Sequence, residues 1–335
     1  MWSDPEIETV LPGVHRVPLP LPGDALKAIN VYLLEEADGY TLIDSGWDSR
    51  RGKEAMREQL AALKVDVGQI RRIYITHLHR DHVGQSTHLS RRSGAEVWIG
   101  EGERRGYLGC TEDMPSIAKS QREYLLRAGA TELVELMERN VQVPPPADWD
   151  LPRHWTTDGE TLPGGLTAIA TPGHTQGHTS FHDARRGIFL PGDHVLPHIT
   201  PSIGFEPFPT RTALADFLAS LAKVRELEAG LVLPAHGPVF TDLAGRVDEL
   251  VAHHDKRLDL CLKALRPNGS TALDVATQLP WTRRERNYAD LDVFNQVLAV
   301  WETLAHLELL VSQERAEPAT RNGGGIAAFR PKVCA

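Results

Sequence analysis

The segment from Tyr74 to Gln85, with the sequence YITHLHRDHVGQ, places three histidines and one aspartate within six positions, directly after a run of β-forming residues. Imidazoles and a carboxylate crowded into one turn are costly to desolvate unless they share a bound partner. Imidazole nitrogen and carboxylate oxygen are the ligands that zinc and related divalent cations accept in proteins. The turn therefore predicts a metal site whose first ligands are His77, His79, Asp81 and His82.

Three later segments offer further donors of the same kinds. His174 stands in TPGHTQGH, Asp193 in LPGDH and His236 in PAHG, each after an apolar run and beside glycine or proline. Together with the first turn they make five imidazoles and two carboxylates, a set that suits two adjacent divalent cations. A carboxylate such as Asp193 can bridge two cations, and a water held between them loses a proton near neutral pH. The donors thus predict a hydrolase whose nucleophile is a metal-bridging hydroxide.

This donor set resembles that of the metallo-β-lactamase-fold hydrolase superfamily, over roughly residues 8 to 240. The TPGHTQGH segment is similar to the glyoxalase II and thioesterase branch. The resemblance implies an α+β fold: a four-layer αββα sandwich with a small, mostly helical, winged-helix-like C-terminal domain. It assigns catalytic roles to Asp81 and Asp193. It also implies a first metal on His77, His79 and His174, a second on Asp81, His82 and His236, and Asp193 as the bridge.

Other polar residues near the donors have weaker assignments. Asp44, which ends a strand in LIDSGW, resembles the buried acid that orients a metal-binding loop in the family, with a plain Asx-turn as the alternative. His178 resembles the second histidine of the family's TPGHTxGH segment, which implies a structural position and not a ligand position. His194 and His198 flank the predicted metals; we predict a substrate contact for His198, with an ordinary loop role as the alternative.

Sheet elements must position these side chains. The sequence INVYLLEEADGYTLIDSGW predicts a β-hairpin that turns at Asp38 and Gly39. A helix is expected in SRRGKEAMREQLAALK and a strand in IRRIYIT, directly before the histidine turn. Donors on loops at strand ends are what a rigid sheet presents.

Two regions have a different composition. We predict a catalytic domain over residues 1–250, with a helical insertion at about 101–152 that is either a lid or a packing element remote from the site. Residues 251–335 are predicted to form the C-terminal domain, with an amphipathic helix around Trp301 and a two-stranded wing at a Gly-rich turn. The helix near Trp301 is expected to be exposed and to serve a homodimer, and His253 and His254 are expected to be solvated.

Composition limits the class of protein. The 335 residues are 41% hydrophobic and carry a net charge of −9, which fits a soluble globular protein and argues against nucleic acid as a partner. Residues 251–335 hold 11 Lys and Arg against 10 Asp and Glu, so this region adds no basic surplus. The cysteines are far apart and no apolar run reaches about 18 residues, which predicts a cytoplasmic protein that does not enter a membrane.

Comparison within the superfamily limits the expected class of substrate. Asp193 stands where one major group of true β-lactamases has cysteine, and the presence of Asp81, His82 and His236 argues against a mononuclear iron dioxygenase. We expect hydrolysis of a small acyl substrate, a thioester of coenzyme A or glutathione or an ester. The alternatives are a nuclease or phosphodiesterase, a lactonase or β-lactamase-like hydrolase, and a non-catalytic binding protein. Zinc is the expected metal, with iron and manganese as alternatives.

Overall fold

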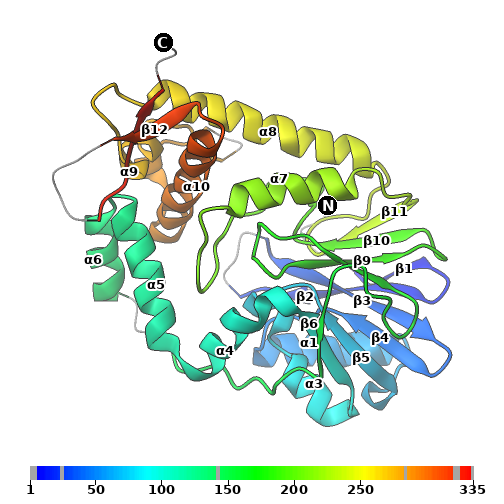
Figure 1. The fold of residues 1–335 in the computed structure, drawn as a ribbon. Coiled ribbons are helices and arrows are strands. Elements are labelled where there is room, and N and C mark those ends of the chain that lie inside the picture. Colours follow the sequence, from blue (N-terminus) through cyan, green and yellow to red (C-terminus); the bar gives the residue numbers. More distant parts are fainter. Residues whose placement is uncertain (1–5, 23–25, 141–143, 283–284, 320–324, 333–335) are drawn as a thin grey trace. The chain divides into compact units, whose positions relative to one another are not determined.

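The computed structural model describes residues 6–22, 26–140, 144–282, 285–319 and 325–332 (Figure 1). The chain divides into two compact units, which are described separately. The first unit comprises Met1–Tyr107, Ala147–Pro201 and Ser220–Val247, and the second comprises Leu108–Pro146, Ser202–Ala219 and Asp248–Ala335. The predicted boundary at residue 250 stays a prediction. None of the described helices is long and apolar enough to cross a bilayer.

A seven-stranded sheet forms the first layer of strands in the first unit, in the order β1 to β7. Neighbours from β1 to β4 are antiparallel, and those from β4 to β7 are parallel. The predicted hairpin is present as β3 and β4, and the predicted strand before the histidine turn is β5. The strands are β1 (Glu8–Leu11), β2 (Val14–Pro20), β3 (Ala28–Glu36), β4 (Gly39–Ile43), β5 (Ile70–Ile75), β6 (Glu96–Gly100) and β7 (His154–Thr156).

A four-stranded sheet faces the first, in the order β11-β10-β9-β8. Its members are β8 (Thr167–Ala170), β9 (Thr179–Asp183), β10 (Ile188–Gly192) and β11 (Leu231–Pro234). Apolar side chains of both sheets share one buried cluster, in which the rings of Tyr74 and Phe181 lie 5.7 Å apart between centroids. Burial of these side chains holds the two sheets face to face.

Helices cover the outer faces of the two sheets. Met56 and Leu60 of α1 (Arg50–Ala62) and Leu89 of α3 (Ser86–Ser93) share a core cluster with the large sheet. Helix α1 is the one predicted from the sequence, and Ser49 caps it by accepting the Gly52 N–H. On the small sheet, Lys223 at the end of α7 (Ala213–Val224) donates to the Ala170 carbonyl. These layers confirm the expected α+β class and αββα sandwich.

The second unit is mainly helical. Its buried centre includes Trp301 of α10 (Val293–Ser312), which is 1% exposed, donates from Nε1 to the Gly204 carbonyl at 2.7 Å and packs against the Tyr124 ring. The expectation that this helix is exposed is wrong, because its buried residues surround the helix axis. The other helices of this unit are α5 (Met114–Arg127), α6 (Thr131–Asn140), α9 (Ala272–Ala276) and η3 (Tyr288–Asp290).

Two further features of the second unit bear on the sequence analysis. Strands β12 (Ala316–Ala319) and β13 (Ala328–Pro331) form an antiparallel pair, as expected for the wing. Most of the predicted Gly-rich turn, residues 321–324, lies outside the described residues, and the winged-helix likeness stays a prediction. The expectation for His254 is wrong, because this side chain is fully buried with Nδ1 at 3.2 Å from Nε2 of His306.

Helices α4 (Arg104–Glu112) and α8 (Leu243–Ala264), like α7, contribute residues to both units. Three short helices complete the first unit: η1 (Val67–Gln69), α2 (Arg80–Val83) and η2 (Glu101–Glu103). The insertion predicted at about 101–152 contains η2, α4, α5 and α6, and its role as a lid stays a prediction.

Candidate metal centre

The histidine turn begins where β5 ends. After Ile75 the chain enters the short helix α2, with His79 at its N-cap position. Gly84 ends this helix where a Cβ atom would lie 2.8 Å from the backbone of Asp48 and of Gly46. Only glycine permits this close approach. The turn therefore packs closely against the chain that follows β4.

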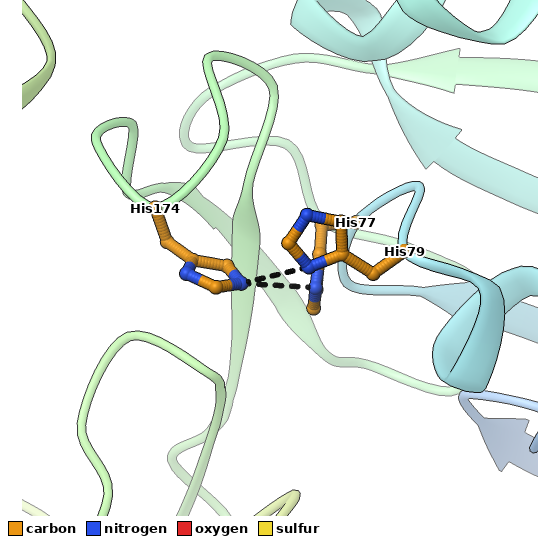
Figure 2. Close-up of side chains that lie close together, drawn as sticks. All are labelled: His77, His79 and His174. Carbon is orange, nitrogen blue, oxygen red and sulfur yellow. Dashed lines mark hydrogen bonds between the residues drawn. The ribbon is translucent and has the colours of Figure 1, made fainter. Parts of the chain in front are cut away.

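Three histidines form the first donor group (Figure 2). Nε2 of His174 lies 3.2 Å from Nε2 of His77 and 3.0 Å from Nδ1 of His79. Tetrahedral zinc with ligands at about 2.0–2.1 Å places neighbouring nitrogens about 3.3 Å apart. The three nitrogens therefore converge at separations that fit one cation.

A second donor group lies beside the first and contains Asp81, His82 and His236. Oδ2 of Asp81 is 3.4 Å from Nε2 of His236 and 3.6 Å from Nε2 of His82. The chain supplies Asp81 and His82 from α2 and His236 from the turn after β11. This group joins donors from both sheets.

Asp193, in the turn after β10, lies between the two groups. Its Oδ1 is 3.6 Å from Nε2 of His82 and 3.4 Å from Nε2 of His236. Its Oδ2 is 3.6 Å from Nε2 of His174. Each oxygen of one carboxylate thus faces a different donor group, which is the arrangement that a bridge requires.

Several donor atoms have no hydrogen-bond partner although they are buried. They are Nε2 of His82, Nε2 of His236 and Oδ1 of Asp193. A buried polar atom that is left unsatisfied costs about 1–3 kcal/mol. Three such atoms pointing at one place fit a bound cation, and the nitrogen and oxygen chemistry of the whole set fits two.

Hydrogen bonds orient the imidazoles so that Nε2 is directed to the centre. Nδ1 of His82 donates to Oδ2 of Asp44 at 2.8 Å, and Nδ1 of His236 donates to the Ala28 carbonyl at 3.1 Å. Nδ1 of His77 lies 3.0 Å from Oγ1 of Thr76. Such contacts fix the ring orientation and tautomer of metal-binding histidines.

Asp44 follows β4 with φ of +61°, a left-handed conformation that aspartate tolerates better than most residues. Its carboxylate also accepts the backbone N–H of Thr76 at 2.8 Å. The residue predicted to orient the metal-binding loop therefore contacts both the start of the loop and one of its histidines.

His178 lies outside the donor groups. Its Nε2 accepts the backbone N–H of Asp193 at 3.2 Å, and its Nδ1 lies 2.7 Å from Oγ1 of Thr171. A Cβ atom at Gly192, whose φ is +54°, would lie 2.8 Å from His178 Nε2. The side chain thus contacts the turn that carries Asp193, and its structural role stays a prediction.

The two flanking histidines have different environments. His194 is fully buried, and burial lowers its pKa to about 3. His198 is exposed and belongs to none of the donor groups. The predicted substrate contact of His198 stays a prediction.

The charges of the second group reinforce each other. Burial by itself would raise the pKa of Asp81, but the neighbouring His82 and His236 outweigh it and lower the pKa to about 2. Burial by itself would lower the pKa of His82, but Asp44, Asp81 and Asp193 outweigh it and raise the pKa well above its usual value. The carboxylates thus generate a negative field that attracts cations.

Two residues of β3, which were not predicted from the sequence, hold the turn of His236. Nδ2 of Asn30 donates to the carbonyls of Pro234 at 3.0 Å and Gly237 at 2.8 Å. The Tyr32 hydroxyl donates to the Pro234 carbonyl at 2.8 Å. The available signal was an asparagine inside the otherwise apolar run AINVYLL.

Glu103 was not predicted from the sequence either; it is buried and accepts a hydrogen bond from Thr175, the residue after His174. It lies in the charged run GEGERRG, where the sequence does not distinguish it from its exposed neighbours Glu101 and Arg104. Arg50 and Arg104, which stand in the charged runs RRGKE and ERRGY, are both exposed.

Residues 25–236 match the Metallo-beta-lactamase superfamily. The chain is similar to the "Probable metallo-hydrolase YqjP" of Bacillus subtilis, with 26% identity over 89% of this chain and 92% of the relative. It is also similar to an "Atrochrysone carboxyl ACP thioesterase" of Aspergillus fumigatus, with 24% identity over 78% of this chain and 67% of that protein.

A solved metallo-beta-lactamase family protein from Thermus thermophilus has a similar fold. It aligns with a TM-score of 0.79 and 29% identity, over 96% of this chain and 100% of that one. The family match covers more than half of the sequence and includes every predicted donor from His77 to His236. The chain therefore belongs to the metallo-beta-lactamase superfamily.

Proposed function

We propose that this protein hydrolyses a thioester or an ester of a small acyl group, with two divalent cations held by the seven predicted donors. The carboxylate of Asp193 carries the proposal, because its two oxygens face the two donor groups separately. The likeness to a fungal acyl-carrier-protein thioesterase supports the substrate class. The TPGHTQGH segment, which resembles the glyoxalase II and thioesterase branch, supports it as well.

When bound, two such cations supply a water of lowered pKa and polarise the carbonyl oxygen of an acyl substrate. The residues of this chain prepare the centre for them. Burial lowers the pKa of His77 well below its usual value, so that its ring stays neutral and keeps a lone pair for a cation. Asp81 and Asp193 provide the negative charge that two dications require.

The donors differ in exposure. The side chains of Asp81 and Asp193 are 18% and 11% exposed and His79 is partly exposed, whereas His82 is fully buried. Water and substrate therefore reach the centre at Asp81, Asp193 and His79. Burial of the other histidines excludes water around them, which strengthens the charge interactions within the centre.

The donor set contains nitrogen and oxygen but no sulfur, which suits zinc, iron or manganese. We propose zinc as the resident metal. We further propose a cytoplasmic location, supported by three cysteines that are widely separated in the sequence, and a small-molecule acyl partner instead of nucleic acid, supported by the net charge of −9.

The experiment is a metal analysis combined with a substrate panel. The purified protein is analysed for bound metals and assayed with an acyl-coenzyme A, S-lactoylglutathione, an aryl ester, a lactone, a phosphodiester and a β-lactam. We expect two metal ions per chain and the highest kcat/KM on a thioester or ester, abolished by a chelator and restored by zinc. A preference for the phosphodiester or the β-lactam, or no turnover of any compound, would overturn the proposal.

A further inference from the structure

Glu103 is the last residue of η2, the short helix that follows β6. It is 1% exposed, so its carboxylate is almost completely removed from water. Its Oε1 accepts the hydroxyl of Thr175 at 2.5 Å and faces the backbone N–H of Leu78 at 3.4 Å. One buried oxygen therefore receives donors from two different turns.

Both turns carry ligands of the first donor group. Leu78 stands between His77 and His79, and Thr175 follows His174 directly. The two turns are distant in sequence but meet in space, since the nitrogens of His174 and His79 lie 3.0 Å apart. Glu103 is thus in contact with the chain beside all three histidines.

Close backbone contact fixes the position of Glu103. A Cβ atom at Gly177 would lie 2.0 Å from the backbone nitrogen of Glu103, and one at Gly102 would lie 2.7 Å from the Gln176 carbonyl oxygen. No side chain fits between the two segments. The carboxylate is therefore anchored to the turn of His174 by the backbone as well as by Thr175.

Burial raises the pKa of Glu103 to about 7, and the contributions that oppose burial come from Thr175 and Leu78. Among the described residues, no cationic side chain contributes to this balance. An apolar side chain at this place would avoid the cost of desolvating a carboxyl group. The carboxyl group of Glu103 instead supplies a hydrogen-bond acceptor that joins the turn of Leu78 to the turn of Thr175.

We propose that Glu103 is a positioning residue for the first metal, which holds the turn of His77 and His79 and the turn of His174 at the separation that one cation requires. The inference rests on the metal centre of the proposed function but not on its substrate. Its test is therefore metal binding by the apoprotein, and hydrolysis is not a readout.

The variants follow from the fact that both donors meet the same oxygen. Glu103→Gln keeps an acceptor oxygen of the same reach, whereas Glu103→Met keeps the length of the side chain and removes the acceptor. Cobalt(II) is titrated into each apoprotein, followed by its visible absorption and by calorimetry. Loss of a contact to the neighbourhood of a ligand weakens metal affinity about 10- to 100-fold.

We expect Glu103→Met to weaken one of the two cobalt-binding events about 10- to 100-fold and to alter its absorption band, while the other stays within about threefold. Glu103→Gln should retain both events. Thr175→Val removes one of the two donors and should weaken the same event to a smaller extent, which keeps the inference testable if Glu103→Met does not fold.

The matched control is Asp183→Asn. Asp183 is also fully buried, but it belongs to none of the donor groups, and its partners are the Arg185 backbone N–H and the Arg186 side chain. If the apoprotein Tm falls in both Glu103→Met and Asp183→Asn, and Glu103→Met shows no selective loss of cobalt affinity, Glu103 has a merely structural role and the inference is overturned. The inference would also be overturned if Glu103→Met weakened both cobalt-binding events equally, or if Glu103→Gln lost as much cobalt affinity as Glu103→Met. Failure of the wild type to bind cobalt would instead reject the metal centre itself.

Discussion

Oδ2 of Asp44 lies 2.8 Å from Nδ1 of His82, and both side chains are buried. The same carboxylate accepts the N–H of Thr76, so it couples the end of β4 to the histidine turn. Asp44→Asn should preserve the left-handed backbone, which asparagine tolerates, but remove the charge that orients His82. We expect zinc affinity to fall about 10- to 100-fold. Competition with a chromophoric chelator measures this, and unchanged affinity would contradict an orienting role for Asp44.

Asp193→Ala should remove both metals together, because its oxygens face both donor groups. Loss of a bridging ligand should exceed the 10- to 100-fold effect of an outer contact, and hydrolysis should fall by more than about 100-fold. Metal analysis after dialysis and steady-state kinetics give the two numbers. Glu58→Gln, at an exposed position of α1, is the control. A variant that kept both ions and its full rate would show that Asp193 is not a bridge.

Asn30→Leu should destabilise the turn that carries His236. In this variant the Gly237 carbonyl loses the hydrogen bond from the Asn30 amide. The Pro234 carbonyl loses the same donor and keeps the hydrogen bond from the Tyr32 hydroxyl. We expect the free energy of unfolding of the apoprotein to fall by about 1–3 kcal/mol. Urea unfolding monitored by circular dichroism tests this, with Asn30→Ser as a smaller polar comparison. Equal stability of all three proteins would exclude a role for the amide.

Acid should destabilise the second unit through a pair of buried histidines. Burial, with smaller contributions from Arg257 and His253, lowers the pKa of His306 to about 3, and burial lowers that of His254 well below its usual value. Below about pH 6.5 these two histidines bind protons in the unfolded chain but stay neutral in the folded chain. The free energy of unfolding therefore decreases as the pH falls. For His306 the loss amounts to about 2 kcal/mol at pH 5.

The measurement is the difference in thermal midpoint between pH 7.5 and pH 5 for the apoprotein. A His254→Leu/His306→Leu variant should show a smaller decrease than the wild type. The histidines of the first unit titrate in both proteins, so their contribution cancels in the comparison. An equal decrease in both proteins would mean that this pair is not responsible for the acid sensitivity.

The donors could be predicted from the sequence because each carries its own local signal. His77, His79, Asp81 and His82 are crowded into one turn, and His174, Asp193 and His236 each follow a β-type run at a glycine or proline. Strand ends and turn residues are local properties. The strands that present these side chains could be predicted from the same local signals, namely β-type runs and turn residues.

Residues that support the donors could not be predicted, because their roles depend on burial. Glu103 lies in a charged run and Asn30 in an apolar strand, and neither spacing shows what the chain packs against it. Helix α10 was misjudged for a related reason. Polar residues such as Thr303 and His306 interrupt its apolar pattern, yet both are buried, since Thr303 bonds to the Ala299 carbonyl and His306 to the Glu302 carbonyl.

The two sheets of the first unit each supply part of the donor set, and the last donor, His236, follows the final strand of the smaller sheet. During synthesis on the ribosome, the nascent chain therefore cannot complete the set until that strand has emerged and both sheets have closed on each other. Full metal loading would then report correct maturation of this unit, and partly loaded protein recovered from cells would mark chains that stopped before closure.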